Sequence, residues 1–192
     1  MLRDELKART AAAHRRAEQA MGGVGAVSGA PARYAQFLCC MAALHARWRG
    51  VQDAGAALAG IDPMGGRIAA ALEDDLRRLG ADDARAPADP RRRAPEQRPA
   101  EGADAEAWGV SYVFEGSAMG AMVLLKAARR AGDRPTAYLS LLAESARTRW
   151  PLFVAGLSAA QAPEQAVIDA ALRAFESVET TARQTEPNAL AS

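Results

Sequence analysis

The sequence predicts an all-α protein that folds as one compact domain of about six helices. Its 192 residues are rich in Ala, Leu and Arg, which favour helices, and aromatic residues make up only 5%. Large apolar residues recur at helical spacing, whereas strict alternation of apolar and polar residues, typical of half-buried strands, is almost absent. The length suits a single domain with a sizeable core.

Glycine and proline mark the ends of the first three expected helices. The first runs from about Leu2 to Met21 and ends at Gly22-Gly23. The second begins near Pro31, a residue suited to a first helical turn. The third opens at Asp62-Pro63, which reads as an N-cap followed by proline, and stops at Gly80.

Three more helices are expected in the C-terminal half. The fourth covers about residues 104–131, and the fifth follows Pro135. We expect Pro151 to break or kink the fifth helix, because proline lacks the backbone N–H and clashes with the preceding turn. The last helix starts at Pro163 and ends before Pro187.

The chain is predicted to form one domain over residues 1–186, followed by a tail at 187–192. Residues 81–103 contain four prolines and many charges but no large apolar side chain, which predicts a solvated loop within that domain. The run Arg91-Arg92-Arg93 inside this loop is either a solvated charged segment or a contact for an acidic partner.

Composition narrows the classes of function. Twenty-four basic and 23 acidic residues give a net charge of +1, which argues against nucleic acid or an anionic membrane as the main partner. The two cysteines, Cys39 and Cys40, are adjacent, so they cannot form a disulfide scaffold. No secretory signal is visible in the first ten residues, and charge and glycines interrupt the apolar stretch Trp108–Leu125. We therefore expect a soluble cytoplasmic protein.

Only two histidines are present, and one of them has chemically suggestive neighbours. His45 lies among apolar residues of the second helix and reads as a packed residue. Thr10, His14 and Glu18 are spaced by four and so share one stripe of the first helix. A neutral imidazole is a good iron ligand, and a carboxylate one turn away can orient it. The alternative is a histidine that simply occupies a helix face.

The fourth helix carries two glycines inside its apolar segment. Gly116 and Gly120 each cost about 1 kcal/mol relative to alanine in a helix, and they open a bare strip on one face. Such a strip serves either close helix packing or a kink, or it lets a flat ligand lie on the backbone. A histidine helix on one side and a glycine helix on the other would sandwich a haem.

These residues resemble a known family, the haem oxygenases. The segment Leu2–Glu18, with T-x-x-x-H-x-x-x-E, resembles their proximal helix, which faces one side of the haem. The segment Trp108–Lys126, with EGSAMGAMVLLK, is similar to the distal helix of the bacterial members. Trp150-Pro151-Leu152-Phe153 resembles their W-x-x-F region. The resemblance covers most of the chain in order, outside residues 81–103.

The resemblance implies a role for each matching residue. His14 would be the proximal iron ligand, with Glu18 as the carboxylate one turn beyond it and Thr10 one turn before it. Gly116, Ser117 and Gly120 would lie over the distal face of the haem. Lys7 falls where relatives place a contact to a haem propionate. Ala121 stands where some relatives carry a further glycine, which marks a subtype.

The residues themselves add two expectations. Lys126, like Lys7, is one of only two lysines in the chain, and it follows the glycine strip, so it is a second candidate for a propionate contact. Glu115 precedes Gly116, but its direction on the helix differs by about 100°, so we expect it to point away from the haem face. No distal proton donor is identified.

The implied reaction is cleavage of haem to biliverdin, carbon monoxide and ferrous iron, with O₂ and external electrons. Haem would be both substrate and cofactor. A redox partner such as a ferredoxin or a flavin reductase and a bilin acceptor protein are the expected partners.

Two other functions remain open from the sequence. One is a haem-binding or haem-transfer protein on the same fold that does not turn over. The other is a thiamin-degrading enzyme of the related helical fold, for which Cys39 or Cys40 would be the nucleophile. The apolar sequence around both cysteines would raise a thiol pKa, which predicts buried structural thiols.

Overall fold

The computed structural model describes residues 2–81 and 102–185, and within these ranges it is all-α with no strand. The helices are α1 (Leu2–Met21), α2 (Gly23–Ser28), α3 (Pro31–Leu58), α4 (Gly65–Arg78), α5 (Ala103–Ala118), α6 (Ala121–Arg130), α7 (Ala137–Ala159) and α8 (Glu164–Gln184). The expected tail at 187–192 and nearly all of the expected loop at 81–103 lie outside the described residues.

The prediction of an all-α domain with about six helices is confirmed. The expected helices correspond to α1, α3, α4, α5 with α6, α7 and α8, and the short α2 is the one element that the sequence did not predict. Gly22, at φ 73°, ends α1 and allows the chain to re-enter a helix at once as α2. The fourth expected helix is divided at Met119 and Gly120, where backbone hydrogen bonds tighten to the i→i+3 type.

Two expected boundaries are wrong. The third expected helix begins at Gly65 rather than at Asp62-Pro63, because a carboxylate from another helix, Asp53 of α3, accepts the Gly65 N–H at 3.2 Å. The fifth continues through Pro151 to Ala159 instead of breaking there. Beyond the proline, α7 buries Phe153 and Leu157 completely or almost so, and this packing offsets the proline penalty of about 3 kcal/mol.

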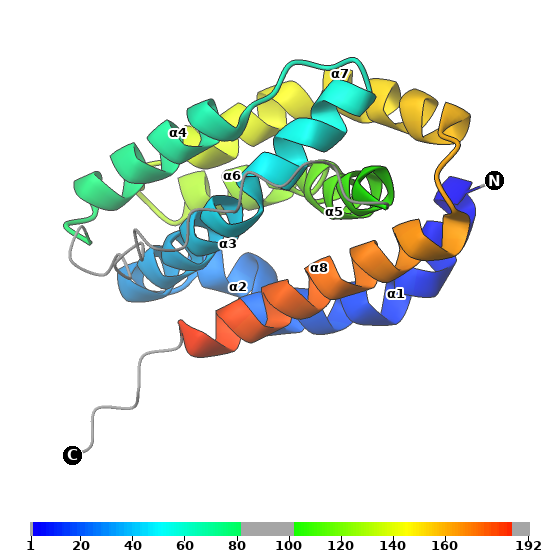
Figure 1. The fold of residues 1–192 in the computed structure, drawn as a ribbon. Coiled ribbons are helices and arrows are strands. Elements are labelled where there is room, and N and C mark those ends of the chain that lie inside the picture. The colour runs from blue at the N-terminus through cyan, green and yellow to red at the C-terminus, as the bar shows by residue number, and fades with distance from the viewer. Residues whose placement is uncertain (1, 82–101, 186–192) are drawn as a thin grey trace, which may run out of the picture.

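The helices lie in three groups (Figure 1). Along one edge of the molecule α1 and α8 run side by side, and α4 and α7 pack together along the opposite edge. Between these edges lie α3 and α5, with α5 packed against α3, α7 and α8. This arrangement makes α5 the central helix of the domain.

Glycines at the helix crossings allow α5 to pack closely. A Cβ atom at Gly109 would lie 2.3 Å from the carbonyl oxygen of Val167 in α8, a distance that no side chain tolerates. At the crossing of α3 and α5, a Cβ at Gly55 would lie 2.0 Å from Ser111 Oγ. The backbone of α5 is therefore held firmly by its neighbours over its first half.

By length and hydropathy, one continuous stretch in the described residues, Ala103–Arg130, could cross a membrane, with a mean hydropathy of 1.2 over its most apolar window. Half of that window is buried inside the molecule.

Candidate functional site

His14 stands on the surface of α1. Its side chain is 59% exposed, and Nδ1 lies 3.9 Å from a carboxylate oxygen of Glu18. On the α8 side, the imidazole and the Phe175 ring form a T-shaped contact with centroids 5.6 Å apart. Two neighbours thus bias the orientation of the ring while leaving most of it accessible, as an exposed metal ligand requires.

Thr10 lies at a different place from His14, although the two share a helix stripe. The Thr10 side chain is buried, and its hydroxyl donates to the Leu6 carbonyl oxygen at 2.7 Å. The same hydroxyl interacts with Tyr112 of α5, whose pKa is raised by burial and partly lowered by this hydrogen bond. Thr10 is therefore a packing residue between α1 and α5. The stripe turns outward after Thr10 because each i→i+4 step rotates by about 40°.

The contact between Thr10 and Tyr112 places the histidine and glycine segments in the same part of the molecule. Past this contact, α1 leads into α2, and α2 packs against α6. His14 lies one turn beyond Thr10, and Gly116 lies one turn beyond Tyr112. The His14 segment and the Gly116–Gly120 segment therefore both lie between the Thr10–Tyr112 contact and the packing of α2 against α6.

The two glycines have different surroundings. A Cβ at Gly116 would lie 3.6 Å from the Trp150 indole, so this bare position is covered by an aromatic ring at ordinary van der Waals distance. Gly120 is exposed, and a Cβ there would meet only the carbonyl oxygen of Ser117, at 3.4 Å. The open part of the expected strip is therefore at Gly120. Ser117 is exposed, and its hydroxyl donates to the Phe114 carbonyl oxygen at 2.8 Å.

Apolar side chains flank the open glycine. Met119 is 49% exposed and Val123 is 59% exposed, and they lie on either side of Gly120 at the turn between α5 and α6. We call Met119, Gly120 and Val123 the apolar wall. Of the six exposed large hydrophobic residues in the described chain, three lie within this short segment: Met119, Met122 and Val123. Such clustering marks a binding surface more often than single exposed residues do.

Both candidate lysines are exposed. Lys7 lies on α1 two turns before His14, and Lys126 lies on α6 one turn after Val123. Their exposure fits either a contact to an anionic ligand group or simple solvation.

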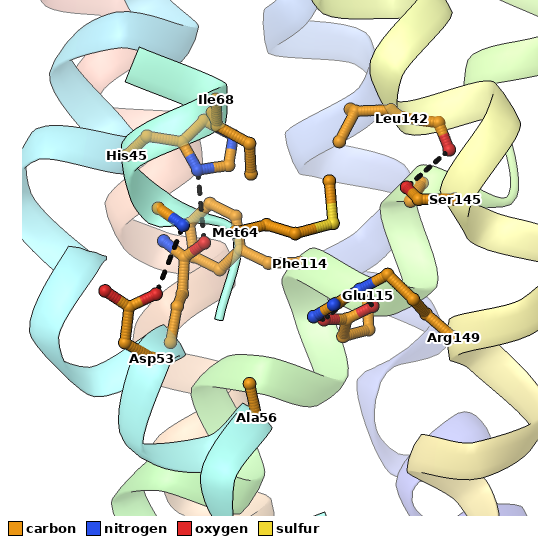
Figure 2. Close-up of a pocket in the computed structure, with 13 residues that line it drawn as sticks. His45, Asp53, Ala56, Met64, Ile68, Phe114, Glu115, Leu142, Ser145 and Arg149 are labelled. Carbon is orange, nitrogen blue, oxygen red and sulfur yellow. Dashed lines mark hydrogen bonds and ion pairs between the residues drawn. The ribbon is translucent and has the colours of Figure 1, made fainter. Parts of the chain in front are cut away.

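Glu115 is held by a side chain of α7. Its carboxylate receives three hydrogen bonds from Arg149 of α7, two from Nε at 3.2 Å and one from Nη2 at 2.5 Å. The two side chains are only 15% and 12% exposed. Glu115 also lines a small cavity of about 30 Å³ together with Phe114 and Ala118, and Gly116 is not part of that lining (Figure 2). The Glu115 carboxylate is therefore fully engaged by Arg149.

The hollows of the molecule lie elsewhere. The cavity of about 30 Å³ lies among α3, α4, α5 and α7, and an open groove of about 620 Å³ runs between the Gly60–Met64 segment and α7. Neither is lined by His14, Gly120 or either lysine. The region that the sequence predicts is an exposed surface rather than an enclosed pocket.

His45 is the packed histidine that the sequence indicated. The ring is buried, with Nδ1 3.1 Å from Gln52 Oε1 and Nε2 3.1 Å from the Tyr138 hydroxyl. Burial lowers the pKa of His45 to about 4. The nitrogens are both engaged inside the protein, so this imidazole is not available as a ligand.

The cysteines are structural thiols. Cys40 is buried with its sulfur 3.3 Å from the Met21 sulfur, and burial raises its pKa to about 11. Burial likewise raises the pKa of Cys39. Because the thiolate is the nucleophile, these environments disfavour cysteine catalysis.

Comparisons with known proteins leave the family open. Within residues 2–81 and 102–185, no three His, Cys, Asp or Glu side chains gather in a way that could hold a metal ion. No protein-family model matches the chain, and no curated protein matches it.

Proposed function

We propose that this chain is a haem oxygenase that cleaves haem to biliverdin, carbon monoxide and ferrous iron. One observation carries the proposal: an exposed histidine, His14, and an open glycine in an exposed apolar wall lie between the same two helix contacts. Both residues belong to the segments that resemble haem oxygenases: His14 lies in Leu2–Glu18, and Gly120 lies in Trp108–Lys126.

The residues present fit a haem. His14 would ligate the iron through a neutral imidazole, oriented by Glu18 and Phe175. Gly120 offers no side chain to obstruct the opposite face, and Met119 and Val123 present apolar surface to a macrocycle. A single protein ligand suffices, because the porphyrin supplies four nitrogen ligands of its own. Lys7 and Lys126 are exposed on the flanking helices and would contact the propionates, which need cations or water.

When bound, haem supplies O₂ binding and the redox chemistry, with electrons from an external donor. The chain would hold and orient it: His14 would ligate the iron, and Gly120 would leave space free of side chains for the macrocycle. Two nearby polar groups are already engaged, because Glu115 is bound by Arg149 and the Ser117 hydroxyl donates within its own helix. Protons would accordingly reach the site from water at the exposed turn.

The proposed activity also includes its partners and its place in the cell. A ferredoxin or a flavin reductase would supply electrons, a bilin acceptor protein could take up the product, and the enzyme would work in the cytoplasm.

The test is a haemin titration followed by reduction under O₂, recorded as absorption spectra with chromatography of the product. We expect a histidine-ligated spectrum and biliverdin from the wild type, loss of both in His14→Ala, and partial recovery with added imidazole. His45→Gln, which changes the only other histidine, should keep haem ligation. Binding without biliverdin would favour a non-turnover haem-binding protein, and a normal spectrum in His14→Ala would remove His14 as the ligand.

A further inference from the structure

Two consecutive residues of α7 hold two consecutive residues of α5. Arg149 binds the Glu115 carboxylate through Nε and Nη2, and the neighbouring Trp150 lays its indole over Gly116 at 3.6 Å from where a Cβ would stand. The absence of a side chain at Gly116 is what allows the ring to approach the backbone of α5. The two contacts therefore grip α5 one turn before Met119 and Gly120.

Arg149 reaches a third segment as well. Its remaining nitrogen, Nη1, donates to the carbonyl oxygen of Asp62, between α3 and α4, at 2.5 Å. The planar guanidinium can serve the carboxylate and the carbonyl together because its donors are fixed in a fork. Figure 2 shows Arg149 and Glu115 lying against each other beside the small cavity. At 12% and 15% exposure the pair is weakly screened by solvent.

Helix α7, which carries Arg149 and Trp150, is itself fixed to neighbouring helices. At the start of α7, both carboxylate oxygens of buried Asp75 accept backbone N–H groups, from Ala137 at 2.8 Å and from Tyr138 at 2.9 Å. The Tyr138 hydroxyl also lies 3.1 Å from His45 Nε2 in α3. Because α7 is fixed to α4 and α3, its contacts with Glu115 and Gly116 fix the position of the end of α5.

We propose that Arg149 and Trp150 form a clamp that sets the position of the Met119–Gly120 turn relative to His14. Arg149 is then a positioning residue: it touches no bound group, and it acts through Glu115 and the backbone of α5. On the basis of the proposed function, the clamp also determines which meso edge of the haem faces the oxidant, because a shift of Gly120 would move the space left open above the macrocycle.

The first arm of the test needs no haem. Hydrogen exchange of the backbone amides of residues 116–123 is compared between wild type, Arg149→Lys and Arg149→Met. Arg147→Met is the matched control, because Arg147 lies exposed on the same helix two residues earlier. Lysine keeps the charge but cannot bind Glu115 and Asp62 O together, so we expect exchange to rise by about tenfold in Arg149→Lys and by more in Arg149→Met. Unchanged exchange in both variants would overturn the clamp.

The second arm measures the biliverdin isomers formed from haem. Altered isomer ratios in Arg149→Lys, with wild-type ratios in Arg147→Met, support the positioning role, since a loss of stability alone would lower the yield without changing the ratio. Raised exchange with an unchanged ratio would overturn that role while leaving the clamp. If wild-type protein forms no biliverdin, the proposed function fails, and the exchange arm still decides whether the clamp exists. Should Arg149→Met fail to fold, Glu115→Gln replaces it, because it weakens the same pair while preserving shape.

Discussion

The buried ring of His45 makes the stability of this protein depend on pH in a defined direction. The ring is 8% exposed and accepts or donates one hydrogen bond on each nitrogen, to Gln52 and to Tyr138. Both are satisfied when Nδ1 carries the proton and donates to the Gln52 amide oxygen while Nε2 accepts from the Tyr138 hydroxyl. Protonating Nε2 would add a charge where there is little water to solvate it, which is why burial lowers the pKa to about 4.

The magnitude follows from the difference between the folded and unfolded pKa values. Unfolded, this histidine titrates near 6.5, and folded, near 4, so its contribution to the free energy of unfolding is complete above about pH 6.5. As the pH falls from 6.5 to 4, the unfolded state takes up a proton that the folded state refuses. At 1.36 kcal/mol per pKa unit the full loss is about 3 kcal/mol, most of it reached by pH 4.5.

The assay is urea unfolding followed by circular dichroism at several pH values between 7.5 and 4.5. His45→Gln lowers stability at neutral pH by removing packing, but it should lose about 2.5 kcal/mol less than wild type across this range. His14→Gln is the matched control, since that side chain is 59% exposed, and it should follow the wild-type curve. Parallel curves for wild type and His45→Gln would refute the reasoning.

Three further predictions follow from the geometry. Asp75→Ala leaves the Ala137 and Tyr138 N–H groups without their acceptors and should cost about 2–4 kcal/mol of unfolding free energy, measured from urea midpoints. Asp74→Ala, which removes only a half-exposed ion pair with Arg77, should cost less than about 0.5 kcal/mol. Gly120→Leu should retain or raise stability yet block haem binding in a spectral titration, whereas Gly120→Ala should do so much less; normal haem affinity in the leucine variant would assign Gly120 to packing. Lys7→Ala should change the ratio of biliverdin isomers by releasing a propionate, and an unchanged ratio with unchanged haem affinity would remove Lys7 from the site.

The number and order of the long helices could be predicted because they depend on local signals. Helical spacing of apolar residues identified all six, and Gly22 and Pro31 marked true boundaries. The boundaries that were wrong depended on distant partners. The start of α4 is capped by Asp53 from α3, and α7 passes through Pro151 because Phe153 and Leu157 are buried beyond it. Neither partner can be read from the neighbouring sequence.

The candidate site was predictable in part. Spacing alone placed Thr10, His14 and Glu18 on one stripe, but it could not show that Thr10 turns into the contact with Tyr112 while His14 faces solvent. Sequence also could not show the partner of Glu115, because Arg149 lies 34 residues away along the chain. In the sequence, Arg149 is notable only because it directly precedes Trp150 of the W-x-x-F region. That position does not predict an ion pair with Glu115.

Glycines show most clearly what sequence cannot resolve. Gly109 and Gly120 both lie in the apolar stretch of the same expected helix. Gly109 lies inside α5, where glycine costs about 1 kcal/mol relative to alanine, whereas Gly120 lies between α5 and α6. Helix packing requires glycine at 109, because α8 approaches so closely that a Cβ would lie 2.3 Å from the Val167 carbonyl oxygen. At Gly120 the space is open, and an alanine would fit beside Ser117. Helix packing does not require a glycine at 120, and its neighbours Met119 and Val123 are apolar side chains exposed to solvent. A flat apolar group lying on this wall would account for the glycine and for both exposed side chains at once, which is the strongest physical reason to look for haem there.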